Sequence, residues 1–132
     1  MIGRDTRKGP PMTKLKLRIL FDTAMLGPGK AELLQRIGET GSIAAAGRQM
    51  QMSYKRAWSL VEEMNAAFRE PLVSSARGGA GGGGAQVTET GQEVLRRYLA
   101  VLEAAEQAGA AEVTALEALL APATKVDMSE EK

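Results

Sequence analysis

The chain has 132 residues, with 17 Lys and Arg against 16 Asp and Glu, for a formal net charge of +1. Hydrophobic residues make up 44% and charged residues 25%, which favours one globular domain with tails over a disordered protein. The sequence contains neither cysteine nor histidine, so a disulfide framework, thiolate metal sites and the commonest general base are excluded. We expect no metal and no cofactor.

No apolar run in the sequence approaches the roughly 20 residues that a membrane-spanning helix needs. The polar start of the chain also lacks the apolar segment of a signal peptide. These two features predict a cytoplasmic protein without a membrane partner.

Charge is distributed unevenly along the chain. Residues 1–18 carry six basic side chains and one acidic one, whereas residues 87–132 carry four basic and nine acidic ones. A basic N-terminal segment and an acidic C-terminal segment are typical of a protein that presents one face to a polyanion. An ordinary solvated surface with a polar tail accounts for the same counts, so charge alone does not choose between the two.

The first predicted elements are an arm and a strand. Residues 1–13 are polar and basic and show no periodicity, which indicates a flexible arm. Residues 15–21 alternate apolar and basic side chains at their start, the period-two pattern of a short strand. Residues 27–29 combine glycine and proline and predict a turn.

Two helices are expected next. Apolar residues at helical spacing predict a helix that begins at Lys30 and ends at Gly38 or Gly41. Ser42 is a suitable N-cap for a second, alanine-rich helix of about two turns. Residues 51–52 interrupt that helix and predict a tight turn.

A longer helix follows, with Ser53 as its expected N-cap and Pro71 closing it. Its apolar residues fall on one stripe, as expected for a helix that buries one face. They are Ala57, Leu60, Val61, Met64 and Phe68.

A hairpin is predicted after this helix. Residues 72–74 and 86–88 favour strands, and residues 77–85 between them contain six glycines, too many for regular structure. The glycine run includes the spacing of a dinucleotide-binding loop. A strand rather than a helix follows it, so we interpret it as the tip of a long hairpin. A plain disordered loop remains the alternative.

The last predicted helix begins at Thr88 or Thr90. Its apolar residues cover more of its circumference than one small core needs, which indicates a dimer interface. The expected interface residues are Val94, Leu95, Tyr98, Leu99, Val101 and Leu102. The competing interpretation is that residues 15–21 and the first helix cover the second face within one chain.

The order of these elements predicts a mainly α domain with a small β wing. Two helices joined by a tight turn form a helix-turn-helix, and the following hairpin makes it a winged helix-turn-helix. We expect this domain to span residues 14–121, with its long C-terminal helix used for dimerisation and a polar tail at 122–132.

In a helix-turn-helix the second helix enters the major groove of DNA with its N-terminal residues leading. The expected DNA-contacting residues are Ser42, Ser53, Tyr54, Lys55, Arg56 and Ser59 on the helices and Arg77, Gly79, Gly81 and Gly82 on the wing. For Tyr54, contact with a phosphate and packing at the helix start stay equally open. For Trp58, packing is favoured over stacking on a base.

Four motifs together resemble one family. They are Gly41-Ser42-Ile43, the SYKxAW run at residues 53–58, Glu63-Met64-Asn65, and the glycine-rich segment 77–88 followed by Gly91. These residues closely resemble the N-terminal domain of the ModE family of molybdate-responsive transcription regulators, from about residue 15 to residue 108. The resemblance implies a winged-helix fold, of the kind also found in LysR-type regulators, that binds DNA as a homodimer.

ModE proteins continue into molybdate-binding modules, whereas only about two dozen residues follow position 108 here. We therefore expect no molybdate site in this chain. Glu62 and Glu63 are the only adjacent carboxylates of the predicted core, and neighbours on a helix diverge by about 100°, so no enzyme is expected. The alternative function is a winged-helix module that binds proteins, or an adaptor for a separate oxyanion-binding partner. DNA binding would weaken steeply with salt, and an apolar protein interface would not.

Overall fold

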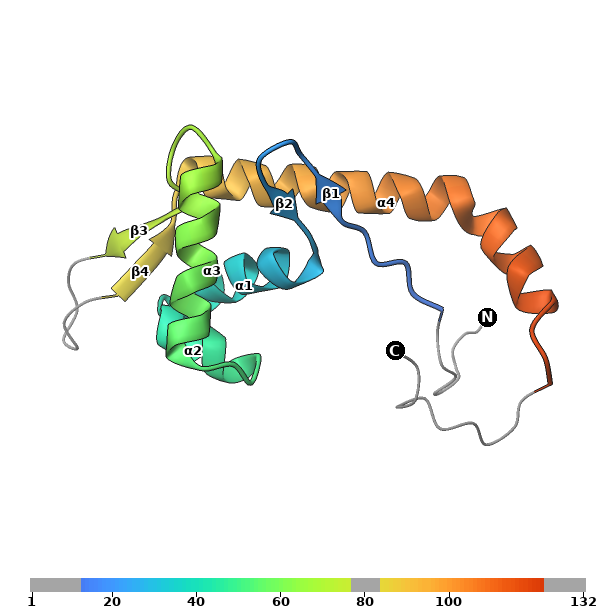
Figure 1. Ribbon diagram of the computed structural model, residues 1–132, viewed down its shortest axis with the longest axis horizontal. Helices are drawn as coiled ribbons and strands as arrows, with labels where there is room; N and C mark the ends of the chain where they lie inside the picture. The colour runs from blue at the N-terminus through green and yellow to red at the C-terminus, as the bar shows by residue number, and fades with distance from the viewer. Residues whose placement is uncertain (1–12, 77–83, 123–132) are drawn as a thin grey trace.

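The computed structural model describes residues 13–76 and 84–122 (Figure 1). Its elements are β1 (Ile19–Leu20), β2 (Met25–Leu26), α1 (Pro28–Thr40), α2 (Ile43–Gln49), α3 (Tyr54–Ala67), β3 (Val73–Ala76), β4 (Gly84–Val87) and α4 (Glu89–Ala118). The first three helices and the β3–β4 hairpin gather at one end of α4, and the other end of α4 extends away from them. This is the predicted mainly α winged helix-turn-helix.

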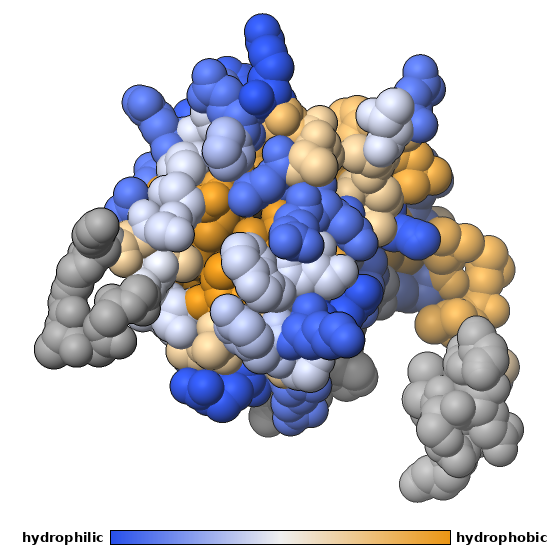
Figure 2. All heavy atoms as spheres, turned by 60° about the vertical axis from the view of Figure 1, so that its left-hand side comes forward, coloured by the Kyte–Doolittle hydropathy of each residue, from blue (hydrophilic) through white to orange (hydrophobic). Residues whose placement is uncertain are grey.

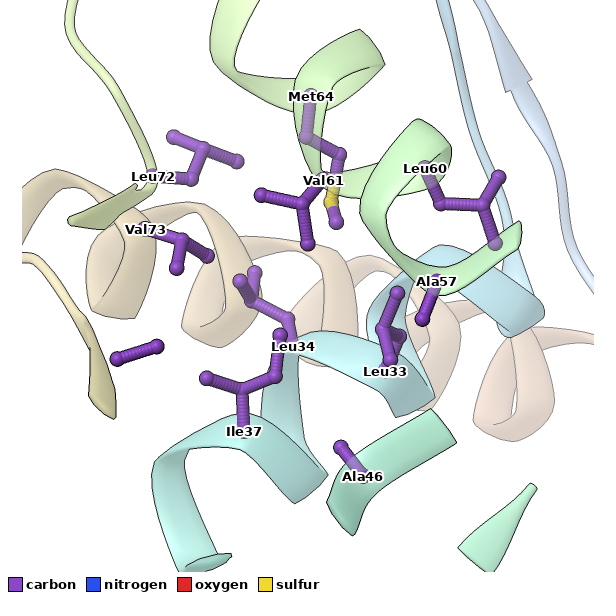
Figure 3. Packing of buried hydrophobic residues seen from close by; sticks show 11 residues of the cluster. Leu33, Leu34, Ile37, Ala46, Ala57, Leu60, Val61, Met64, Leu72 and Val73 are labelled. Atoms are coloured by element: carbon purple, nitrogen blue, oxygen red, sulfur yellow. The ribbon is translucent and has the colours of Figure 1, made fainter. Parts of the chain in front are cut away.

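The core lies between α1, α3 and the hairpin (Figure 3). Leu33, Leu34 and Ile37 of α1 are fully buried. They meet Ala57, Leu60, Val61 and Met64 of the predicted stripe on α3, which are all buried, and Leu72 and Val73 at the start of the hairpin. The fifth predicted member, Phe68, is half-buried and follows the helix, which ends at Ala67 rather than at Pro71. Because α3 is held along this one face, its opposite face is left for solvent.

Helix α1 begins earlier than predicted. Residues 27–29 were expected to form a turn, but Pro28 occupies the first helical position and Gly27 precedes it as the N-cap. Proline fits there because a helix leaves its first N–H groups unbonded and proline has none to lose. The helix ends as expected at Gly41, whose φ of 73° is left-handed.

Both serine caps form as predicted. The Ser42 hydroxyl accepts a hydrogen bond from the Ala45 amide at 3.0 Å, and the Ser53 hydroxyl accepts one from the Arg56 amide at 3.0 Å. The turn between α2 and α3 passes through Gln51, which has a φ of 61°. Two helices so closely joined fix the direction of α3 relative to α2.

The N-terminal strand is shorter than predicted. Only Ile19–Leu20 pairs, with Met25–Leu26 of β2. Residues 13–18 have no strand partner within the described ranges 13–76 and 84–122, so they lack the ladder of hydrogen bonds that defines a strand. This segment is tied to α4 instead, since the Tyr98 hydroxyl donates to the Leu17 carbonyl at 2.6 Å and the Thr13 hydroxyl donates to Glu117.

The wing is an antiparallel pair in which Val73 lies opposite Val87 and Ala76 opposite Gly84. It is fixed to the helices, because the Ala85 amide donates to the Gly41 carbonyl at 3.0 Å. The predicted contact residues Arg77, Gly79, Gly81 and Gly82 lie outside the described residues.

Helix α4 is continuous for 30 residues, from Glu89 to Ala118. Thr88 is its N-cap and accepts a hydrogen bond from the Gly91 amide at 3.0 Å. Across residues 13–76 and 84–122, no helix is both long and apolar enough to span a membrane.

Candidate nucleic-acid interface

The first turn of α3 presents the cationic part of the candidate interface. Lys55, Arg56 and Ser59 are exposed, whereas Ala57 between them is fully buried. Neither cation forms an ion pair with another described residue. Their side chains are therefore available to a ligand, and the N-terminus of a helix favours a negative one.

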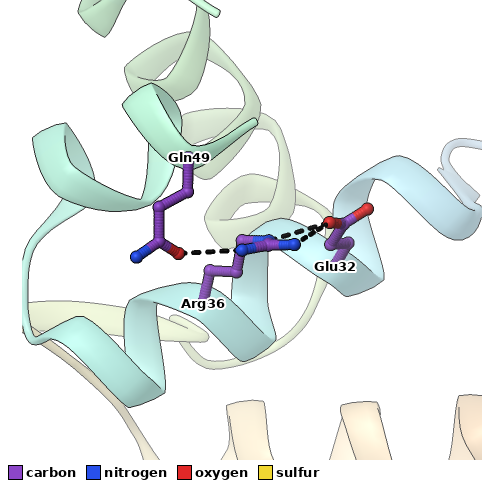
Figure 4. A network of polar contacts seen from close by, with 3 residues as sticks. All are labelled: Glu32, Arg36 and Gln49. Atoms are coloured by element: carbon purple, nitrogen blue, oxygen red, sulfur yellow. Dashed lines mark hydrogen bonds and ion pairs between the residues drawn. The ribbon is translucent and has the colours of Figure 1, made fainter. Parts of the chain in front are cut away.

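Other cations of the helical core are already engaged. Arg36 donates to Glu32 at 2.8 Å and to Gln49 at 2.9 Å, which joins α1 to α2 (Figure 4). Lys30 is buried, and its ammonium group lies 3.0 Å from the Met25 carbonyl and 3.1 Å from Glu63. These residues position α2 and α3.

A hollow of about 510 Å³ lies between α3 and the wing. Residues from three elements line it: Ser42, Ile43 and Ala44 at the start of α2, Tyr54, Trp58 and Asn65 on α3, and Val73, Ser74, Ser75, Gly84 and Ala85 on the wing. None of these lining residues is acidic. Of the predicted DNA-contacting residues, Ser42 and Tyr54 meet in this hollow, and Lys55, Arg56 and Ser59 project from the same helix.

Trp58 lies beside the wing, as the packing hypothesis expected, yet its side chain is 41% exposed. Tyr54, one turn earlier, is 54% exposed. Residues four apart lie on the same side of a helix. The two aromatic rings therefore form one edge of the hollow, and this edge is open to solvent.

Asn65 has a role that sequence patterns did not identify. Its side-chain oxygen accepts from the amides of Leu72 at 2.8 Å and Val73 at 3.1 Å, and its nitrogen donates to the Val73 carbonyl at 3.1 Å. These three bonds fasten the wing to α3 and so set the width of the hollow. An asparagine inside a helix was the available signal, because asparagine is unfavourable there unless its side chain has a partner.

Replacing Asn65 by alanine is expected to lower the free energy of unfolding by about 2 to 3 kcal/mol, because two amides and one carbonyl lose their partner. Urea denaturation followed by circular dichroism measures the change. Replacing the exposed Ser59 of the same helix by alanine is the control and should change stability by less than about 0.5 kcal/mol. An Asn65→Ala variant with unchanged stability would contradict the conclusion that Asn65 fastens the wing to α3.

The predicted interface residues of α4 divide into two groups. Tyr98 is 3% exposed and packs with Leu26 and Ala31, and burial raises the pKa of its phenol above the ordinary value. Val94 and Leu95 are half-buried against the core. Tyr98 thus belongs to the chain's own core and offers no surface to a partner.

Leu99 and Val101 are 42% and 45% exposed, and Leu102 is half-buried. The competing interpretation, in which the chain covers its own helix, therefore holds for the face of α4 that packs against β1, β2 and α1. Leu99 and Val101 lie outside this covered face. Three leucines that the sequence patterns did not assign to the interface are more exposed still: Leu116, Leu119 and Leu120, at 61%, 79% and 72%.

A second hollow, of about 640 Å³, lies beside the N-terminal half of α4. Phe21, Phe68, Val94 and Val101 contribute apolar surface to it, and the two phenyl rings meet edge to face with centroids 6.4 Å apart. Arg69 and Arg97 also line it, together with Glu70 and Glu93. In the described residues no three acidic side chains gather closely enough to hold a metal ion.

No protein-family model matches the sequence. Individual proteins do match it. The chain is 39% identical over 85 residues to the transcriptional regulator ModE of Yersinia pestis and 38% identical over 85 residues to the DNA-binding transcriptional dual regulator ModE of Escherichia coli, each match covering 64% of this chain and 30% of the relative. It is 44% identical over 78 residues to the molybdenum-pterin-binding protein MopB of Rhodobacter capsulatus, covering 59% and 29%.

The chain is thus homologous to ModE regulators and Mop proteins over about two thirds of its length, and it spans about three tenths of theirs. The fold is similar to that in the crystal structure of the CbnR DNA-binding domain with DNA, with a TM-score of 0.53 and 19% identity over 67% of this chain and 95% of that one. These matches confirm the ModE resemblance and the winged helix-turn-helix fold. The relatives are named as transcription regulators and binding proteins, not enzymes.

Proposed function

We propose that this protein is a cytoplasmic transcription regulator that binds duplex DNA as a dimer, with α3 in the major groove and the wing beside it. The observation that carries the proposal is the state of Lys55 and Arg56, which are exposed and unpaired among the described residues on a helix whose other face is anchored in the core. The ModE relatives support it, since their names describe regulators.

The proposed contacts use three kinds of group. Lys55 and Arg56 contact bases or phosphates from the first turn of α3, and Ser59 lies one turn further along. Ser42 and Ser53 accept bonds from their helices through their oxygens, so each hydroxyl hydrogen is free to reach a phosphate. On the wing, the proposal includes Arg77, Gly79, Gly81 and Gly82, because glycine backbones approach DNA closely.

Selection of bound duplexes from a random pool with the purified chain tests this function. We expect enrichment of one site with two-fold symmetry, and an affinity that falls linearly with salt on logarithmic axes. A pool that shows no enrichment, with no salt-dependent binding, would contradict the proposal. Binding of a protein partner that salt does not weaken would favour an interaction module instead.

The dimer proposal rests on two apolar surfaces at opposite ends of α4. One is formed by the exposed Leu116, Leu119 and Leu120, and the other by the hollow that Phe21 and Phe68 line. In a two-fold dimer any contact between two different surfaces occurs twice, once in each direction. Two α4 helices that cross in opposite directions near their midpoints would therefore set the leucines of each copy over the hollow of the other.

Charge favours the same arrangement. From residue 103 to its end, α4 carries four acidic residues, Glu103, Glu106, Glu112 and Glu117, and no basic residue. The hollow beside the N-terminal half is lined by Arg69 and Arg97 together with Glu70 and Glu93, and Arg97 pairs with Glu93 at 3.0 Å. An antiparallel pair brings the acidic part of one helix alongside this region of mixed charge on the other, whereas a parallel pair would place the acidic parts together.

Replacing Leu119 by glutamate is expected to separate the dimer, because an unpaired charge in an apolar interface costs about 3 kcal/mol or more. The monomer should stay folded, since Leu119 is 79% exposed in a single chain. Sedimentation equilibrium at micromolar concentration measures the change. The control is Ala118→Glu, which adds the same charge at the preceding exposed position, about 100° around the helix. A wild-type protein that is monomeric at tens of micromolar would refute the dimer.

A further inference from the structure

We infer that the hollow between α3 and the wing seats one sugar–phosphate strand of the DNA, held by Tyr54 and Trp58 through uncharged hydrogen-bond donors. This inference rests on the proposed function and adds a second kind of contact to it. Lys55 and Arg56 supply positive charge from the exposed face of α3. The hollow instead supplies a concave surface without charged side chains, in which the strand can lie.

The position of the hollow suits a backbone strand. When α3 lies in the major groove and the wing lies beside it at the adjacent minor groove, the strand that separates the two grooves passes between α3 and the wing. The space between these two elements is the hollow itself. In Figure 1 the wing stands next to α3, with the β3–β4 ladder on the side away from β1 and β2.

The lining of the hollow suits a phosphodiester chemically. Tyr54 and Trp58 bring a hydroxyl and an indole N–H as donors, one of the strand serines Ser74 and Ser75 can add a hydroxyl, and no lining residue is acidic to repel an anion. The hollow beside α4 is lined by Glu70 and Glu93, and a third hollow, of about 540 Å³, is lined by Glu63, so both lack this property. Of these three hollows, only the one between α3 and the wing combines donors with an absence of acidic groups.

The apolar part of the lining suits the sugar. Ile43 and Ala44, both half-buried, contribute hydrocarbon surface, which can contact the carbon atoms of deoxyribose. Figure 2 shows apolar atoms exposed on the near face of the molecule and framed by more polar ones. A seat with an apolar floor and donors at its edge matches a strand that carries both sugar carbons and phosphate oxygens.

The rings of Tyr54 and Trp58 are exposed although no packing within the chain requires it, and contact with a ligand would explain this exposure. Aromatic residues make up only 4% of the sequence, and Trp58 is its one tryptophan. Nevertheless 41% of Trp58 and 54% of Tyr54 are exposed, side by side on α3. Asn65 fixes the wing at a set distance from this edge, so the hollow has a defined width before any ligand arrives.

The test uses Tyr54→Phe and Trp58→Phe, each of which removes one donor and keeps an aromatic ring. Affinity is measured for the selected site and for a random duplex at several salt concentrations. We expect each variant to bind both DNAs about three- to tenfold more weakly, the effect of one hydrogen bond. The slope of affinity against salt should stay unchanged, because no cation is lost, whereas Lys55→Ala should reduce that slope by about one.

Three other results would contradict this inference, and they can be told apart. A Trp58→Phe variant that selects different bases, or that weakens only the selected site, would show that Trp58 contacts bases and would overturn the seat. Wild-type affinity in both variants would overturn it as well. If the wild-type chain shows no salt-dependent DNA binding, the proposed function fails and this inference fails with it.

Discussion

Replacing Lys55 and Arg56 together by alanine is expected to weaken binding to a selected site by about 2 to 4 kcal/mol, roughly 30- to 1,000-fold. Both side chains are exposed on α3, and neither pairs with another described residue, so their loss removes contacts without disturbing the core. Fluorescence anisotropy with a labelled duplex measures the affinity, and urea denaturation checks that stability is unchanged.

The charge-matched control is Lys14→Ala with Lys16→Ala. These lysines are exposed in the extended segment beside α4, and their replacement removes the same two positive charges. Charges separated by more than about 8 Å are largely screened at physiological salt, so we expect a change of less than about threefold. Equal losses in the two double variants would mean that net charge, rather than α3, governs binding. An unchanged affinity in the well-folded Lys55 and Arg56 variant would contradict the assignment of α3.

The sequence located α2, α3 and the wing because their signals are local, although the wing strands run over Val73–Ala76 and Gly84–Val87 rather than over 72–74 and 86–88. Ser42 and Ser53 cap helices that begin at the next residue, and the stripe from Ala57 to Met64 follows helical spacing. Each of these patterns depends on residues within one or two turns of one another. The prediction for the start of α1 was wrong because it also used only local signals. Pro28 lies between two glycines, a pattern typical of a turn, but it occupies the first position of the helix that follows.

The features that sequence reasoning missed depend on contacts between distant segments. Tyr98 was assigned to the dimer interface because its own helix has a wide apolar face, yet the Leu17 carbonyl, 81 residues away, accepts its hydroxyl hydrogen bond. Asn65 gained its role from the amides of the wing. No periodicity within one element encodes such pairings, since they depend on how the elements pack.

The site combines both kinds of information. Lys55 and Arg56 were identified from their place in a helix-turn-helix, but the hollow required the structure, since its lining comes from α2, α3 and the wing. The same holds for α4, where the sequence indicated excess apolar surface, and the structure located the most exposed part of it at Leu116, Leu119 and Leu120.

The largest expected loss of stability follows from replacing Gly91 by alanine. A Cβ atom at this position would lie 2.3 Å from the Leu72 carbonyl oxygen and 2.7 Å from a methyl group of Val87. Backbone at the start of the wing cannot shift cheaply, because Asn65 and Thr88 also bind it there. We expect a loss of about 3 kcal/mol, a large fraction of the roughly 5–15 kcal/mol that holds a typical domain together.

Gly109→Ala in the same helix is the matched control for Gly91→Ala. A Cβ atom added to Gly109 would have no neighbouring atom within 4 Å, so the new methyl group meets open space. Alanine also favours the helix over glycine by about 1 kcal/mol, and we therefore expect unchanged or slightly higher stability. Urea denaturation of both variants, followed by circular dichroism, measures effects of opposite sign from one chemical change. If Gly91→Ala were as stable as Gly109→Ala, the close approach of α4 to the wing would be wrong, and with it the geometry that sets the wing beside α3.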